Sequence, residues 1–71
     1  MNTALSVFGR RLRYERSVRA VGQAAMAKFL GVSLATYSKW EQQDRTPSFD
    51  ALERVARCLG LEVWELLKPW Q

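Results

Sequence analysis

A very short connection between two helical segments is the feature that most constrains this chain. The sequence KFLGVSLATYSKWEQ, residues 28–42, contains an apolar helical run, a glycine, one valine and a serine that begins a second run. Gly31 can adopt the left-handed conformation that ends a helix, and Ser33 can cap the helix that follows. Because so few residues join them, the two helices are expected to cross at a steep angle. The segment therefore predicts a tight corner between two helices.

Helical spacing of apolar residues recurs along the whole chain, whereas the alternation typical of strands is absent. Ser6 and Ser48 are predicted N-caps of the first and fourth helices, and Gly60 is expected to end the fourth. The expected architecture is all-α, with one domain over residues 1–71. We predict five helices, at about residues 6–19, 23–30, 34–42, 48–59 and 62–68.

The apolar side chains of these helices fall on one side of each and are expected to form a shared core. Tyr37 and Trp40 lie three residues apart in the third helix, and we expect both to face inward. The other predicted core residues are Val7, Phe8, Leu12, Ala24, Met26, Ala27, Leu30, Leu52, Val55, Ala56 and Leu59.

Composition narrows the classes of function. Eleven Lys and Arg against seven Asp and Glu give a net charge of +4, which suits an acidic partner such as nucleic acid. The chain has no histidine, and its one cysteine, Cys58, cannot form an intramolecular disulfide or a cysteine metal cluster. We therefore expect no enzyme activity, metal or cofactor. With no signal peptide and no apolar run of the ~18–20 residues that span a bilayer, we expect no membrane association and a cytoplasmic location.

Three segments, FGRRLRYER, GQAAMAKFLGVSLATYSKWEQ and PSFDALERVARCLGLEVWELL, resemble the helix-turn-helix domain of the lambdoid phage repressor, Cro and related regulators. The resemblance covers about residues 8–67. In this family the first helix of the pair crosses a phosphate backbone and the second lies in the major groove. The resemblance implies a compact five-helix domain, sequence-specific binding of double-stranded DNA through residues 34–42, and a repressor that binds a palindromic operator as a homodimer. It is carried by Gln23, Ala27, Gly31, Val32, Ser33, Glu41, Pro47, Ser48, Leu52, Ala56, Leu59, Gly60, Leu66 and Leu67.

The resemblance also places residues of the third helix at base edges. Lys39 can donate to guanine, Ser38 can bond either way, and Ala35 can touch a thymine methyl group. The alternative is an ordinary solvated helix face. The predicted base-contacting residues are Leu34, Ala35, Thr36, Ser38 and Lys39.

A second set is expected to contact phosphate. Gln23 begins the second helix, where free backbone amides and its own amide group can bind an anion. This family usually has a glycine at position 43, so Gln43 departs from its pattern, and Asp44 would repel phosphate. The predicted phosphate-contacting residues are Gln23, Ser33, Gln42, Gln43 and Arg45.

Two further expectations concern structure. By resemblance, Arg11 of the first helix pairs with Glu41 of the third and ties the recognition helix to the scaffold. Trp64 and Trp70 are predicted to form the dimer interface, with completion of the core as the alternative.

The competing class of function is a protein-binding module, such as an antitoxin, whose corner holds a toxin or another regulator rather than DNA. It is favoured by the modest basic content of residues 34–44, where Lys39 stands against Glu41 and Asp44. Among regulators, a Cro-like phage repressor, a restriction–modification controller and an antitoxin all remain open. A chain of this length has no room for a ligand-sensing domain, so regulation is expected to come from concentration, competition or a partner protein.

Overall fold

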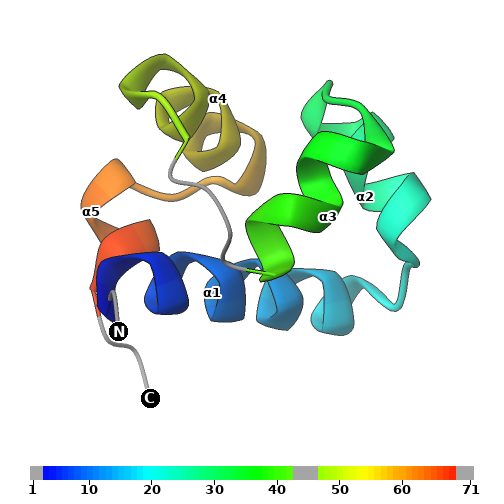
Figure 1. Ribbon diagram of the computed structural model, residues 1–71, viewed down its shortest axis with the longest axis horizontal. Helices are drawn as coiled ribbons and strands as arrows, with labels where there is room; N and C mark the ends of the chain where they lie inside the picture. Colours follow the sequence, from blue (N-terminus) through cyan, green and yellow to red (C-terminus); the bar gives the residue numbers. More distant parts are fainter. Residues whose placement is uncertain (1–2, 43–46, 69–71) are drawn as a thin grey trace.

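The computed structural model describes residues 3–42 and 47–68, with side chains from residue 7 onward (Figure 1). Every regular element in this part of the chain is a helix, which confirms the all-α, five-helix prediction. The observed ends lie within three residues of the predicted ones. The helices are α1 (Thr3–Arg19), α2 (Gln23–Leu30), α3 (Leu34–Gln42), α4 (Phe49–Leu59) and α5 (Val63–Leu67).

The largest difference between prediction and structure is at the start of α1. This helix begins at Thr3, so Ser6 lies inside it rather than at its N-cap, and that prediction was wrong. Ala4 and Leu5 are both strong helix formers, so the helix extends through them ahead of the serine.

The predicted stop and start signals of the later helices are confirmed. Gly22 is the N-cap of α2 in an extended conformation, without a side chain to help. The Ser48 hydroxyl accepts a hydrogen bond from the Ala51 amide at 3.2 Å and so caps α4. Gly60 ends α4 with a φ of 73°, a conformation that side chains other than glycine rarely adopt.

The longest helix, α1, supports the others (Figure 1). α3 and α5 both pack against it, α2 packs against α3, and α4 packs against α2 and α5. In Figure 1 the α2–α3 pair lies over the end of α1 that leads into α2, and α5 lies near its other end. The domain measures 27 × 23 × 23 Å, so no part of this short chain lies far from the core.

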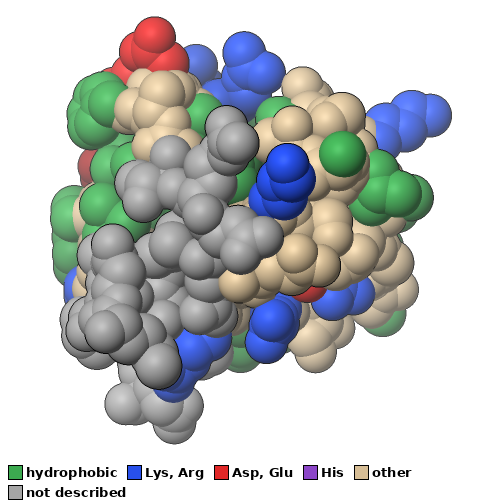
Figure 2. Space-filling model, viewed as in Figure 1, with side chains coloured by type: hydrophobic (Ala, Val, Ile, Leu, Met, Phe, Trp, Pro, Cys, Tyr) green, Lys and Arg blue, Asp and Glu red, His purple; other side chains and the backbone are tan. Residues whose placement is uncertain are grey.

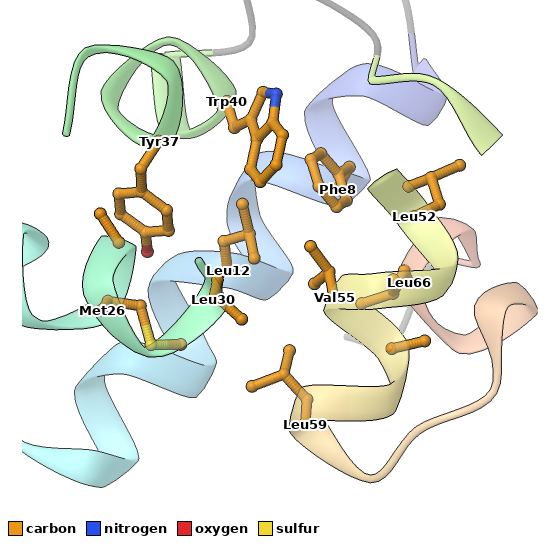
Figure 3. Packing of buried hydrophobic residues seen from close by; sticks show 12 residues of the cluster. Phe8, Leu12, Met26, Leu30, Tyr37, Trp40, Leu52, Val55, Leu59 and Leu66 are labelled. Carbon is orange, nitrogen blue, oxygen red and sulfur yellow. The ribbon is translucent and has the colours of Figure 1, made fainter. Parts of the chain in front are cut away.

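All five helices contribute to one apolar core (Figure 3). The inward position of Tyr37 and Trp40 is confirmed. Ala24 is exposed, contrary to prediction, because it lies two residues, or about 200° of helical rotation, before the buried Met26. The core consists of Phe8, Leu12, Met26, Ala27, Leu30, Tyr37, Trp40, Leu52, Val55, Ala56, Leu59 and Leu66.

Candidate nucleic-acid interface

The corner between α2 and α3 is closed by backbone and side-chain hydrogen bonds. Gly31 has a φ of 77°, and its amide donates to the carbonyl of Lys28 at 3.1 Å. The Ser33 hydroxyl then accepts a hydrogen bond from the Thr36 amide at 3.1 Å, which caps α3. The two local roles predicted for Gly31 and Ser33 are confirmed, and together they fix the direction in which α3 leaves the turn.

One side of α3 is anchored in the core. Tyr37, Trp40 and Glu41 are all buried. The Trp40 ring packs edge-on against Phe8 of α1, with ring centroids 5.8 Å apart, an arrangement that aromatic pairs favour. Because side chains three and four residues apart lie on the same side of a helix, these residues hold α3 by a continuous face.

Glu41, at the C-terminal end of this face, accepts hydrogen bonds from three helices. Arg16 of α1 donates from Nε at 2.7 Å and from Nη2 at 3.1 Å, a bidentate contact. Gln23 of α2 donates from Nε2 at 2.9 Å, and the Tyr37 hydroxyl of α3 donates through a short hydrogen bond. Arg13 donates to the Glu41 backbone carbonyl at 3.0 Å. The buried carboxylate therefore joins α1, α2 and α3 at one point.

This environment shifts the pKa values of three of the groups. Burial alone would raise the pKa of Glu41, but hydrogen bonds from Arg16, Tyr37 and Gln23 outweigh it and hold that pKa below its ordinary value. Burial, followed by the hydrogen bond to Glu41, raises the pKa of Tyr37. The hydrogen bond to Glu41 raises the pKa of Arg16. At neutral pH the network therefore consists of a carboxylate, a guanidinium and a neutral phenol.

The predicted pairing of Arg11 with Glu41 was wrong. Arg11 Nε lies 2.9 Å from Glu15 Oε2, and its Nη1 donates to the Glu65 carbonyl of α5 at 3.4 Å. Arg16 takes the place beside Glu41 because it lies five residues later, about 7.5 Å further along α1. The end of α3 packs against that later turn. The tie between α1 and the recognition helix exists, but its arginine was misassigned.

The opposite side of α3 is open to solvent. Ala35, Lys39 and Gln42 are exposed and Ser38 is partly exposed, at spacings of three and four residues that place them in one stripe along the helix. Leu34, at the leading end, keeps 49% of its surface exposed, which is unusual for a leucine without a partner surface. Thr36 lies to the side and accepts a hydrogen bond from the Ser33 hydroxyl. Contact of these residues with bases stays a prediction.

The residues predicted to contact phosphate are less uniform. Gln23 is half-buried and uses its amide nitrogen on Glu41, a role that the sequence reading missed. Ser33 is exposed beside its capping bond, and Gln42 lies on the α3 stripe, where its Nε2 is 3.5 Å from the Ser38 hydroxyl. Gln43 and Arg45 lie outside the described residues. Phosphate contact by any of the five remains a prediction.

Part of this network was visible in the sequence. Tyr37 and Glu41 stand four residues apart, which places them on the same side of a helix. A glutamate beside two buried aromatics needs a partner, so the spacing signals a buried hydrogen bond. Sequence spacing does not show that Gln23 and Arg13 converge on the same residue.

Trp64, predicted for the dimer interface, is 57% exposed on α5. The Lys68 ammonium lies 4.8 Å from the centre of its ring, a cation–π contact, and Leu67 beside it is also exposed. Trp70 lies outside the described residues. The alternative that Trp64 completes the core is therefore wrong, and its part in a dimer is still a prediction.

Charged side chains surround this part of the molecule. In the view of Figure 2, Lys and Arg side chains outnumber Asp and Glu side chains and are separated by uncharged surface. Among the described residues, no group of three His, Cys, Asp or Glu side chains is placed to hold a metal ion. Within the same part of the chain, each helix is too short or too polar to cross a bilayer.

Comparison with known proteins identifies the family. The profile of the family described as "Helix-turn-helix domain" matches residues 7–67. Repressor protein C2 of Salmonella phage P22 is 35% identical over 68 residues, which are 96% of this chain and 31% of that protein. The cryptic phage CTXphi transcriptional repressor RstR of Vibrio cholerae is 33% identical over 60 residues, 84% of this chain and 54% of that protein. The chain thus spans about a third to a half of the length of these relatives.

The fold agrees with that assignment. The solution structure of the DNA-binding domain of the P22 C2 repressor superposes with a TM-score of 0.77 at 35% identity, covering 96% of this chain and 87% of that one. The match includes both helices of the corner, and it confirms the resemblance drawn from the sequence. The chain belongs to the helix-turn-helix domain family.

Proposed function

We propose that this protein is a sequence-specific double-stranded DNA-binding transcription regulator that inserts α3 into the major groove. One observation carries the proposal: α3 presents an exposed stripe while its opposite side is fixed in the core and its end is joined to α1 and α2. A helix that reads bases must be both accessible and rigidly oriented. The named functions of the relatives, a phage repressor and a transcriptional repressor, support the same role.

The stripe carries chemistry suited to base edges. Lys39 can donate to guanine O6 or N7, and the Ser38 hydroxyl can donate or accept. Leu34 and Ala35 offer apolar contact to thymine methyl groups. The Thr36 side chain is already hydrogen-bonded to Ser33, so it contributes mainly to holding the start of the helix.

Phosphate contacts would position the domain. The first amides of α2 point out of the helix, and Gln23 stands there with its side-chain oxygen still able to accept. Ser33 lies at the equivalent place on α3, and Gln43 and Arg45 complete the expected set. Positive net charge supplies the attraction that does not depend on sequence.

The proposal includes a repressor that acts as a homodimer on a palindromic operator in the cytoplasm. Trp64 and Leu67 form an exposed apolar area on α5 that suits a twin subunit. A two-fold axis through such a contact would place two copies of α3 about 34 Å apart, one turn of DNA.

The experiment that tests the proposal is selection from random duplex DNA at two salt concentrations. We expect a two-fold symmetric consensus, with an affinity that falls steeply as salt rises because bound phosphates release their counterions. Absence of enrichment at both concentrations would refute the DNA-binding role.

A matched pair of variants tests the stripe itself. Lys39→Ala should lose guanine preference at one position in each half-site, by about tenfold. Lys28→Ala removes the same charge from an exposed position of α2 and should leave every base preference unchanged. Equal behaviour of the two variants in the selection would contradict the role of Lys39.

A protein-binding module is the second candidate. It is favoured by exposed aromatics away from the α3 stripe, Phe29 on α2 and Phe49 on α4, which are 52% and 63% exposed. It is also favoured by the single basic residue of α3. Failure of the selection at both salt concentrations would make this the leading function, with a toxin or another regulator as partner.

A further inference from the structure

We infer that Gln42 reads a base pair beside the one read by Lys39, rather than holding a phosphate. This inference deepens the proposed function and rests on it. The family pattern suggested a backbone contact for this residue, but the structure places its side chain on the same exposed stripe as Ser38 and Lys39.

The first step is the position of Gln42 around α3. It follows Ala35 by seven residues, Ser38 by four and Lys39 by three, so all four lie within roughly 100° of one another at 3.6 residues per turn. The buried face of α3 lies on the other side. Whatever surface Lys39 meets, Gln42 meets it too, one turn further along.

The second step is the direction of the amide group. Gln42 Nε2 donates to the Ser38 hydroxyl at 3.5 Å, at the long end of hydrogen bonding, and this contact lays the side chain back along the stripe. The amide oxygen and the second N–H then remain as an adjacent acceptor and donor. That pair matches the N6 donor and N7 acceptor of adenine in the major groove.

The third step is reach. Lys39 and Gln42 are three residues apart, about 4.5 Å along the helix axis, which is close to the ~3.4 Å rise between neighbouring base pairs. The two side chains can therefore address adjacent base pairs. We expect adjacent guanine and adenine preferences in each half-site, assigned to Lys39 and Gln42 respectively.

The experiment compares wild-type protein with Gln42→Ala on the selected operator and on all its single-base variants. Loss of about tenfold preference for adenine at one position, next to the guanine lost in Lys39→Ala, is the expected result. Equal weakening on every sequence, with all preferences kept, would overturn the inference and assign Gln42 to the phosphate backbone. Unchanged affinity on every sequence would overturn it as well.

Two further variants sharpen the test. Gln42→Glu should move the preference at that position from adenine to cytosine, because a carboxylate accepts from the cytosine amino group. Ser38→Ala removes the hydroxyl that orients the amide, and it should reduce the adenine preference by less than Gln42→Ala does. Because Gln42 is exposed, the melting temperatures of its variants should equal that of the wild type. If wild-type protein selects no operator at all, the proposed function itself has failed, an outcome distinct from a loss confined to the variants.

Discussion

The two buried carboxylates of the domain have about the same exposure but different surroundings. Glu41 is 2% exposed and accepts hydrogen bonds from Arg16, Gln23 and Tyr37, on three different helices. Glu15 is 7% exposed, and within the described residues its carboxylate pairs with Arg11 and Arg19, both on its own helix.

The comparison separates two uses of the same charged group. Pairs four residues apart on one helix stabilise that helix but say nothing of where it lies in the fold. A carboxylate that collects donors from several helices is satisfied only when those helices are correctly placed. Glu41 is therefore suited to orient α3, whereas Glu15 reinforces α1.

The largest effect is expected from Glu41→Gln. It removes the charge that Arg16 faces in a buried site, and we expect a loss of about 2–3 kcal/mol in the free energy of unfolding, near the low end for a broken buried pair. Arg16 retains 26% exposure, which lets water compensate in part. The melting temperature should fall by about 10–20 °C. Glu53→Gln, the same change at an exposed site of α4, is the control and should have almost no effect.

Tyr37→Phe comes next. It removes one donor to the carboxylate but keeps the buried ring, so we expect a cost of about 1.5–2 kcal/mol, typical of a hydrogen bond to a charged group. Combining it with Glu41→Gln gives a double-mutant cycle, measured by chemical denaturation. The two changes should be less than additive, and simple additivity would contradict a direct hydrogen-bond coupling.

These two residues show what the sequence can and cannot specify. The four later helices were predicted to within one residue at either end, because glycine and serine mark helix ends through local conformation that needs no knowledge of the fold. The start of α1 was not, because Ser6 has the chemistry of a cap but follows residues that extend the helix.

The candidate site divides in the same way. The exposed stripe of α3 follows from helical periodicity alone, so its residues could be identified in advance. The choice between Arg11 and Arg16 could not be made, because it depends on which turn of α1 meets the end of α3. That register is set by packing of Phe8 against Trp40 and by the rest of the core. Charge pattern shows that an arginine is available but not which one.

Acid sharpens the comparison further. The pKa of Glu41 is lower in the folded protein than in the unfolded chain, so the unfolded state takes up its proton first. The resulting stabilisation is complete above the unfolded value of about 4.3 and is lost as pH falls through the folded value. The stability difference between wild type and Glu41→Gln should therefore stay constant above about pH 5 and shrink below it. A difference that persists unchanged into the acid range would contradict the assignment.

Glu15→Gln should have the smallest effect. Its two partners on α1 are worth about 0.3–0.5 kcal/mol each as pairs four residues apart, so the total is about 1 kcal/mol even with some gain from burial. The midpoint of thermal unfolding should fall by only about 4–8 °C. Arg11 also reaches the Glu65 carbonyl, and that bond to α5 survives the substitution. A loss as large as that of Glu41→Gln would mean that burial alone sets the worth of these carboxylates. A clearly smaller loss would mean that donors from separate helices do.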